Sequence, residues 1–213
     1  HASNVVRVRS GEDVVLFDGR GVEVFGKVLG TERRGVAVAV DRRVEHPAVP
    51  QRLTLVCGAL HRDKSIDDLI RRCAEVGTAS FRFFRATHSE RPPRDLEKLR
   101  RVAIETCKQC GKVWLPTITF HTGLADALDG VTGRLLIAKF GDDAVPLRDA
   151  LRDQSDVSIV VGPEGDFSAE EIELALARGA LPLSLGDTRF RAEAAAALLS
   201  AVAQYEWGRL GPV

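Results

Sequence analysis

The chain has 213 residues, of which 45% are hydrophobic and 28% are charged, as is ordinary for a globular domain. This composition excludes a collagen, a coiled coil and a disordered tail. No apolar run approaches the roughly 20 residues of a membrane-spanning helix, so we expect no membrane partner. Residues 1–112 hold 22 basic and 15 acidic side chains, whereas residues 113–213 hold 8 and 15. Either one half faces a polyanion, or solvated helix faces simply differ in charge.

The first 45 residues predict short strands separated by glycine-containing turns. A turn at residues 18–21 and three or four strands in so short a stretch indicate a small β-barrel or a fragment of one. The sequence contains no methionine, so we expect residue 1 to lie inside this first domain. The polar, proline-containing segment 45–50 predicts a boundary between domains 1–48 and 49–213. The β-rich segments are residues 14–17, 22–29 and 35–40.

From residue 52 onward, predicted strands and helices alternate. Ser65 can cap a helix that Gly77 ends, and residues 95–110 form a helical pattern that Gly111 closes. Such alternation is typical of an α/β fold with a mostly parallel sheet and helices on both of its faces. The predicted strands are residues 53–60, 79–86, 113–118, 134–138 and 157–161.

The four cysteines give no sign of a metal site. Cys57, Cys73, Cys107 and Cys110 lack the paired spacing and the accompanying histidines of a zinc site, so we expect no metal. Cys107 and Cys110 are spaced as a redox pair, but they lie near the end of a predicted helix rather than at its N-terminus. They are therefore interpreted as structural thiols, and reduced cysteines fit a cytoplasmic protein.

The most informative segment follows the predicted strand 157–161. It contains the loop Gly162-Pro163-Glu164-Gly165, after which Ser168 and Glu171 have the spacing of a helix capping box. In parallel α/β sheets, ligands bind at the carboxyl ends of the strands. The loop is therefore either a rigid ligand-binding loop or simply a good turn. Its acidic residues favour a cationic ligand, and neither a P-loop nor a dinucleotide fingerprint is present.

A second segment has the same character. The predicted strand 181–186 ends in glycine and leads through residues 187–191 into an apolar helix at residues 192–207. Arg191 and Glu193 stand at the start of this helix. They are either functional side chains or surface charges, since a glutamate in the first turn is favoured by the helix dipole.

Nearly the whole chain resembles the RsmE family of SPOUT-class methyltransferases. The most specific match is residues 160–168, which correspond to the family's I-G-P-E-G-G-F-S motif. Residues 185–186 and 190–194 correspond to its L-G and L-R-x-E-T segments. Shorter matches lie at residues 6–7, 16–19, 74–77, 89–91 and 109–112.

This resemblance implies a fold and an activity. The family methylates N3 of a uridine in 16S ribosomal RNA of the small ribosomal subunit, with S-adenosylmethionine as the methyl donor. Its members carry a PUA-like β-barrel, expected to be incomplete here, followed by a SPOUT α/β domain. The C-terminal segment of that domain forms a trefoil knot, an exception to the rule that chains do not thread loops. The family works as a homodimer with its active site at the subunit interface.

The resemblance also implies residue roles. Backbone groups of residues 162–165 and 185–191 would hold the cofactor, and Arg191 would stabilise the anionic uracil or a flanking phosphate. Glu193 would either orient Arg191 or accept the N3 proton. The implied cofactor-binding residues are Ile137, Ala138, Val161, Gly162, Pro163, Glu164, Gly165, Leu185, Gly186, Phe190, Arg191 and Ala192. The implied RNA contacts are Arg7, Arg20, Arg91, Gln109 and Lys112.

Three positions near the implied site depart from the family pattern. Asp166 replaces a glycine, Asp187 stands at a usual proline, and Ala194 stands at a usual threonine. These changes leave open a second hypothesis, a non-catalytic RNA-binding or ribosome-assembly protein with a decayed SPOUT domain. A third hypothesis, an α/β enzyme that uses a different nucleotide, rests on the fold class alone.

Overall fold

The computed structural model describes residues 8–32, 35–89, 95–141, 143–151 and 156–211. The chain divides into two compact units: unit 1 comprises residues 1–49 and 113–115, and unit 2 comprises residues 50–112 and 116–213. The predicted domains 1–48 and 49–213 do not include this return of residues 113–115 to the first unit. Within the described ranges, no helix is both long enough and apolar enough to cross a membrane.

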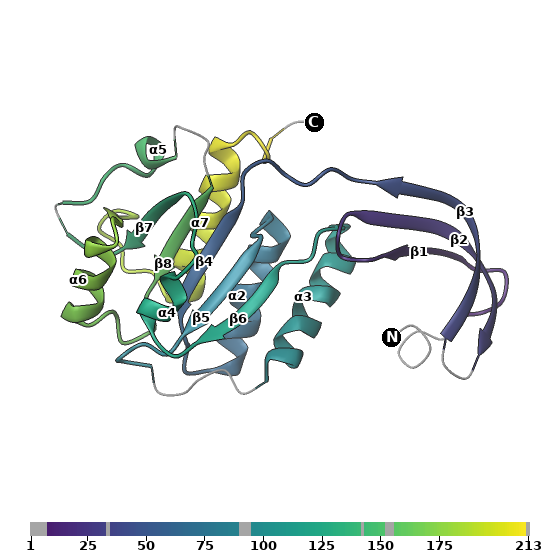
Figure 1. Ribbon diagram of the computed structural model, residues 1–213, viewed down its shortest axis with the longest axis horizontal. Helices are drawn as coiled ribbons and strands as arrows, with labels where there is room; N and C mark the ends of the chain where they lie inside the picture. The colour runs from purple at the N-terminus through teal and green to yellow at the C-terminus, as the bar shows by residue number, and fades with distance from the viewer. Residues whose placement is uncertain (1–7, 33–34, 90–94, 142, 152–155, 212–213) are drawn as a thin grey trace. The chain divides into compact units, whose positions relative to one another are not determined.

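Unit 1 contains an antiparallel sheet in the order β1-β2-β3 (Figure 1). Between β1 and β2, the Asp18 carboxylate accepts hydrogen bonds from the backbone N–H groups of Arg20 (2.7 Å) and Val22 (3.0 Å). This arrangement is the usual way in which an aspartate stabilises a tight turn. The β2–β3 register shifts beside Gly26, where a Cβ would lie 2.1 Å from the Ala39 carbonyl oxygen. The strands are β1 (Asp13–Phe17), β2 (Val22–Glu32) and β3 (Gly35–Glu45).

The predicted strand at residues 113–118 is wrong in its placement. Residues 113–115 pair instead with the turn of unit 1: the Gly21 N–H donates to the Val113 carbonyl (3.1 Å), and the Leu115 N–H donates to the Gly19 carbonyl (3.0 Å). The strand of unit 2 begins only at Thr117. An apolar run signals pairing with some strand or turn, and here tertiary structure chose the partner.

Unit 2 is built on a six-stranded parallel sheet in the order β6-β5-β4-β8-β7-β9. From β4 the chain adds β5 and β6 on one side, whereas β8, β7 and β9 lie on the other (Figure 1). The order therefore reverses between β4 and β8, which is where such sheets bind ligands. The strands are β4 (Leu53–Gly58), β5 (Ser80–Phe84), β6 (Thr117–His121), β7 (Arg134–Ala138), β8 (Val157–Val161) and β9 (Leu181–Leu183).

Helices cover both faces of this sheet. Side chains alternate along β4, so that Leu55 and Cys57 pack in the core beneath α2, α3, α5 and α7, whereas Val56 packs in the core beneath α4 and α6. This arrangement confirms the predicted α/β class with helices on both faces. The helices are α2 (Asp63–Val76), α3 (Leu96–Cys110), α4 (Leu124–Leu128), α5 (Leu147–Ala150), α6 (Ala169–Ala177) and α7 (Ala192–Glu206).

Most predicted helix ends are confirmed. Gly77 and Gly111 end α2 and α3 in the left-handed conformation, with φ of 103° and 71°. Ser168 forms the predicted capping box with Glu171. Ser65 does not cap α2, which begins two residues earlier after Arg62 without any side-chain cap. Asp67 and Asp68 follow Ser65 and were expected in the first turn of the helix, but they lie in the second turn of α2. Their position therefore did not locate the first residue of the helix.

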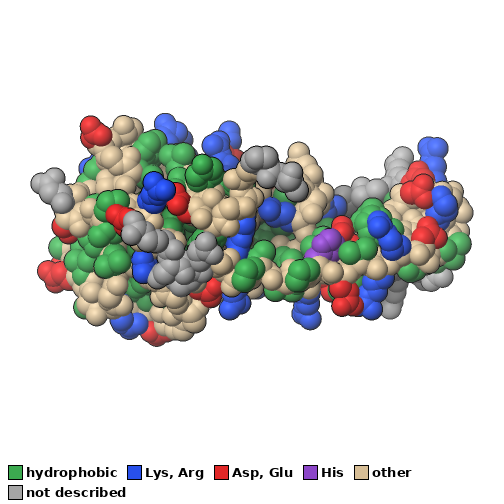
Figure 2. All heavy atoms as spheres, turned by 90° about the horizontal axis from the view of Figure 1, so that it is seen from above, with side chains coloured by type: hydrophobic (Ala, Val, Ile, Leu, Met, Phe, Trp, Pro, Cys, Tyr) green, Lys and Arg blue, Asp and Glu red, His purple; other side chains and the backbone are tan. Residues whose placement is uncertain are grey.

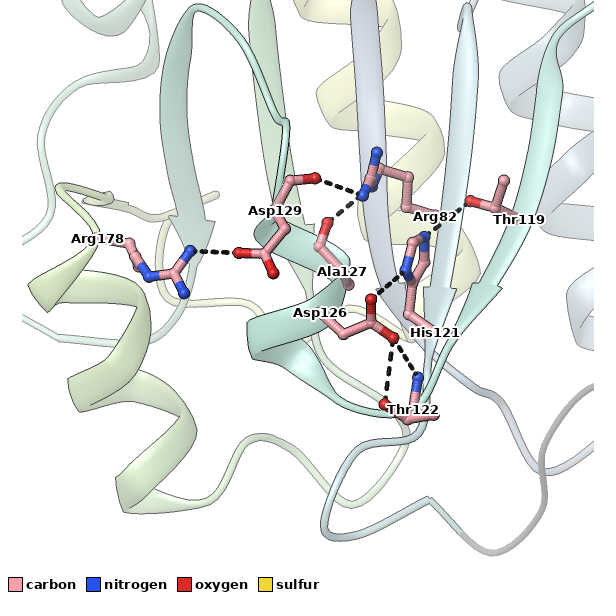
Figure 3. Close-up of polar contacts among 8 residues, drawn as sticks. All are labelled: Arg82, Thr119, His121, Thr122, Asp126, Ala127, Asp129 and Arg178. Atoms are coloured by element: carbon pink, nitrogen blue, oxygen red, sulfur yellow. Dashed lines mark hydrogen bonds and ion pairs between the residues drawn. The ribbon is translucent and has the colours of Figure 1, made fainter.

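A polar network holds α4 against the sheet (Figure 3). The Arg82 guanidinium of β5 donates to the carbonyl oxygens of Ala127 and Asp129, both at 2.7 Å, and so satisfies acceptors at the C-terminal end of α4. In the middle of the same helix, a carboxylate oxygen of Asp126 lies 3.2 Å from Nδ1 of His121, and the other accepts a hydrogen bond from the Thr122 N–H (3.0 Å). The short helix is therefore held to β5 through Arg82 and to the end of β6 through Asp126.

Candidate functional site

Unit 2 contains a cavity of about 640 Å³ at the carboxyl ends of β7, β8 and β9. Small-molecule sites typically measure about 300–1,000 Å³. Three segments supply most of its wall, namely residues 138–140, 161–166 and 183–195, and residues 61–65 after β4 complete it. The cavity therefore lies at the edge of the sheet where its strand order predicts ligand binding.

The loop after β8 packs directly against the end of β4. A Cβ on Gly58 would lie 2.6 Å from Cδ of Pro163, so only glycine allows this approach. The Glu164 carboxylate accepts a hydrogen bond from the His61 backbone N–H, with both of its oxygens at 3.1 Å. These contacts hold the Gly-Pro-Glu-Gly loop at the switch point of the sheet.

The same loop is also joined to the segment after β5. A Cβ on Gly165 would lie 2.8 Å from Cβ of His88, and Nδ1 of His88 lies 3.1 Å from the Asp166 carbonyl oxygen. The Thr87 N–H donates to the carboxylate of Glu171 (2.9 Å), the buried glutamate of the capping box. The helix cap thus serves a second purpose, because it ties residues 87–88 to the loop.

The loop after β9 has its own local order. The Ser184 hydroxyl accepts from the Gly186 N–H (3.1 Å) and donates to the Gly186 carbonyl (3.0 Å), while Gly186 has φ of 94°. The Lys139 N–H donates to the Leu183 carbonyl (3.0 Å), which joins the ends of β7 and β9. The start of the loop between β9 and α7 is therefore held by hydrogen bonds at Leu183 and Ser184.

The structure brings most of the predicted cofactor-binding residues together on the cavity wall. Ile137, Gly165 and Gly186 do not line it: Ile137 is fully buried within the sheet, and the two glycines shape the adjoining loops. Their roles remain predictions from the resemblance. The predicted residues on the wall are Ala138, Val161, Gly162, Pro163, Glu164, Leu185, Phe190, Arg191 and Ala192.

The two predicted catalytic side chains both line the cavity. Arg191 is the N-cap of α7 and is exposed, and Glu193 lies half-buried in the first turn of that helix. Within the described part of the chain, neither side chain forms a hydrogen bond or an ion pair. The guanidinium is therefore available to an anion, at a helix end that itself carries positive partial charge.

The predicted RNA contacts are spread over both units. Arg20 is exposed in the β1–β2 turn of unit 1, and in unit 2 Gln109 is exposed near the end of α3 and Lys112 is half-buried just after it. Arg7 and Arg91 lie outside the described residues. Figure 2 shows basic and acidic side chains interspersed on the visible face of the molecule.

Sequence reasoning missed several wall residues. His61 and Arg62 follow β4, and Lys139 and Phe140 follow β7. For Arg189, between β9 and α7, the sequence predicted a backbone contact but no role for the side chain. A usable signal existed, because the strands at 53–60 and 134–138 were predicted and ligands bind just beyond such strand ends. What the sequence lacked was the strand order, which decides whose ends are neighbours.

The cysteines are thiols of unit 2. Burial raises the pKa of Cys73 to about 12 and that of Cys107 to about 11. It also raises the pKa of Cys57 well above the ordinary value of a thiol, whereas Cys110 is exposed. The three buried thiols are therefore protonated at neutral pH, which suits apolar packing. Among the residues described, no three His, Cys, Asp or Glu side chains group as metal ligands.

A doubly covered parallel sheet with a cavity at its carboxyl edge defines an α/β domain that binds a small molecule or cofactor. A model of the family described as the RNA methyltransferase domain matches residues 47–204, and a model of the RNA methyltransferase PUA domain matches residues 1–41. The chain belongs to the RNA methyltransferase domain family.

Individual relatives agree with this assignment. A Synechocystis protein named ribosomal RNA small subunit methyltransferase E is 27% identical over 200 residues, which cover 90% of this chain and 65% of the relative. The chain thus spans slightly less than two thirds of that relative's length. The resemblance to the RsmE family is confirmed.

Solved structures agree as well. A Porphyromonas gingivalis protein described as a probable rRNA-methyltransferase has a TM-score of 0.83 at 28% identity and covers 98% of this chain and 89% of its own. A Legionella pneumophila protein described as a methyltransferase, solved with bound cofactor SAM, has a TM-score of 0.82 at 26% identity, with coverage of 96% and 87%. The predicted fold class, an α/β domain preceded by a PUA-like domain, is confirmed.

Proposed function

We propose that this chain is an S-adenosylmethionine-dependent methyltransferase that acts on N3 of a uridine in 16S ribosomal RNA of the small subunit. The observation that carries the proposal is the cavity at the ends of β7, β8 and β9, in a chain of the RNA methyltransferase family. The name of the Synechocystis relative supports the ribosomal substrate, and the SAM bound to the Legionella protein supports the cofactor.

The wall of the cavity fits such a cofactor. Val161, Leu185 and Phe190 supply apolar surface for a nucleoside, and the loops 162–165 and 185–191 supply backbone N–H and C=O groups for its polar atoms. The carboxylates of Glu164 and Glu193 lie on the same wall and suit a ligand with a positively charged sulfur. We propose that these residues hold the cofactor.

S-adenosylmethionine supplies an activated methyl group on a sulfonium centre. For the methyl group to end on uridine N3, the N3 proton must leave, and negative charge develops on the uracil as it does so. Holding both reactants in line supplies much of the rate enhancement in such a transfer. The Arg191 guanidinium, unpaired among the described residues, stabilises that charge or a flanking phosphate.

Glu193 is proposed to accept the N3 proton. The sequence left two roles open, orientation of Arg191 or proton acceptance. An orienting role needs contact between the two side chains, and no ion pair joins Arg191 to Glu193 in the described structure. Proton acceptance needs a carboxylate within hydrogen-bonding reach of uridine N3, and Glu193 is a carboxylate on the cavity wall.

RNA recognition is proposed to involve both parts of the chain. The N3 edge of a uridine is used in base pairing, so the target base must be unpaired or flipped out. Residues 1–48 are proposed as the RNA-binding domain. Arg20, Gln109 and Lys112 are proposed to contact the sugar-phosphate backbone of the RNA. The resemblance further implies a homodimer, a trefoil knot in the domain at 49–213 and action in the cytoplasm, where ribosomal subunits are found.

Calorimetric titration with S-adenosylmethionine tests the cofactor part of the proposal. We expect saturable binding of one ligand per chain, with NAD and ATP silent as controls. Failure to bind by a folded chain that still binds RNA would overturn the enzymatic proposal. That result would favour the non-catalytic RNA-binding hypothesis and point to Asp187 and Ala194 as the disabling changes.

Substitution of Arg191 tests the catalytic part. Arg191→Ala should lower methylation of small subunits by about a hundredfold or more, because it removes stabilisation of developing charge. Cofactor affinity should change little. Arg148→Ala, an exposed arginine on α5 away from the cavity wall, is the matched control. Turnover of Arg191→Ala near that of the control would contradict the assigned role.

A further inference from the structure

We propose that Arg189 is a positioning residue that clasps the three loops of the cavity together through Asp166 and Phe140. Nη1 of Arg189 lies 3.5 Å from a carboxylate oxygen of Asp166, and its guanidinium carbon lies 4.7 Å from the centre of the Phe140 ring. Phe140 follows β7, Asp166 follows β8 and Arg189 follows β9. One guanidinium therefore joins all three loops. That the ligand of this cavity is S-adenosylmethionine rests on the proposed function.

Asp166 is held in a conformation that serves this contact. It is the one non-glycine residue of the described chain with a positive φ, at 64°. Aspartate tolerates this left-handed region better than most residues, because its short side chain bonds locally. One carboxylate oxygen accepts from the Phe167 N–H (2.9 Å), and the other faces Arg189. The family motif has glycine here, so the clasp is a feature of this chain.

Lys139, a basic side chain that follows β7 on the cavity wall, does not pair with Asp166. Nζ of Lys139 lies 2.6 Å from the carboxylate of Asp143, within its own loop. Arg189, by contrast, contacts residues of both other loops. A guanidinium suits this position, since it pairs with a carboxylate and stacks on an aromatic face at the same time.

The clasp lowers the cost of ordering the loops when a ligand binds. Loops that are already held in place lose less conformational entropy on binding, and this gain appears as affinity. The side chains of Arg189 and Asp166 are 73% and 52% exposed, so the ion pair is screened by solvent and salt. We therefore expect effects of about two- to fivefold on ligand dissociation constants, which shrink at high ionic strength.

A double-mutant cycle tests the clasp. Asp166→Asn keeps a residue that tolerates positive φ, and Arg189→Gln removes the charge and the planar fork. Each single variant should weaken binding about two- to fivefold, and the double variant should bind no more weakly than Arg189→Gln alone, which already removes both contacts. Arg189→Lys keeps the charge and should recover part of the loss. Arg148→Gln is the control and should bind as the parent chain does.

Two ligands separate the clasp from a simple charge effect. S-adenosylmethionine carries a sulfonium charge, whereas S-adenosylhomocysteine does not. Loss of loop ordering should weaken both ligands by similar factors. Removal of a nearby positive charge alone would instead change only the affinity for S-adenosylmethionine, and that result would overturn the proposal.

Amide hydrogen exchange without any ligand separates this inference from the proposed function. Residues 183–191 should exchange about two- to fivefold faster in Asp166→Asn and in Arg189→Gln than in the parent chain. If the parent chain binds neither ligand while exchange still shows the coupling, the clasp stands and the proposed cofactor is wrong. Additive effects on binding, or unchanged exchange in both variants, would overturn the clasp.

Discussion

The two units are both built on sheets, but they bury their apolar side chains very differently. In unit 2, every residue of β8 is buried, because helices cover both faces of the sheet. In unit 1, Val28 is the one apolar strand side chain that is buried among the residues described, whereas Val15, Leu29 and Val40 are 54%, 63% and 62% exposed. β-propensity predicts strands in both units, yet it does not predict a core.

The difference explains why the candidate site is built in unit 2. A cavity that must hold its shape needs wall residues on elements that are locked by packing, and β7 and β8 supply these. In unit 1, close packing rests on buried glycines such as Gly21 and Gly26 rather than on large apolar side chains. Unit 1 therefore presents backbone and exposed side chains, which suits contact with another molecule.

Truncation of a large side chain should give the largest difference between the units in the free energy of unfolding. Phe83→Ala, at a fully buried position of β5, should lower the free energy of unfolding by about 3–5 kcal/mol. Val40→Ala, at an exposed position of β3, should change it by about 0.5 kcal/mol or less. Urea denaturation of both variants checks the comparison. A comparable loss in both would mean that Val40 is covered in solution.

Substitution of a glycine should give a smaller difference in stability between the units, and in unit 2 it should also affect the cavity. Gly58→Ala places a methyl group against Pro163 and should cost about 1–3 kcal/mol through overpacking. It should also weaken cofactor binding, because Pro163 is part of the cavity wall. Gly30→Ala in β2, where a Cβ meets nothing within 4 Å, is the matched control in unit 1. Denaturation and calorimetry together check this prediction, which fails if Gly58→Ala behaves as Gly30→Ala does.

The pH dependence of stability should give the smallest difference between the units. Backbone hydrogen bonds lower the pKa of Asp18 in unit 1, from Arg20 and then Val22, and lower that of Asp126 in unit 2, from Thr122, with His121 adding a further hydrogen bond. A lowered pKa stabilises the folded state above the unfolded value of about 4. This stabilisation is lost as pH falls through the folded value.

The two aspartates can be compared by substitution. Asp126→Ala should lower stability at pH 6, and the difference from the parent chain should diminish as the pH falls below about 4. Asp18→Ala should show a pH dependence of the same sign, because backbone hydrogen bonds lower the pKa of Asp18 as well. Urea midpoints measured between pH 6 and pH 2 check both variants. A difference that persists unchanged at low pH would contradict the hydrogen-bond origin of these pKa values.

Several features could be predicted because they depend on residues close in the chain. The strands at β7 and β8, the ends of α2 and α3 at glycines, and the capping box of Ser168 arise from local propensity and local hydrogen bonds. The segment 113–115 could not be placed in this way. Its apolar residues suit any pairing partner, and the partner lies about 90 residues away in the β1–β2 turn.

By itself, the sequence determined the fold class, the family and the loops that carry the candidate chemistry, because each depends on local pattern or on motifs. Only the tertiary structure decided which strand ends meet. It thereby added His61 and Phe140 to the wall, left Ile137 buried within the sheet, and brought Arg189 to Asp166. The physical reason is that strand order in a parallel sheet depends on which faces pack best over the whole unit, a choice that no single segment encodes.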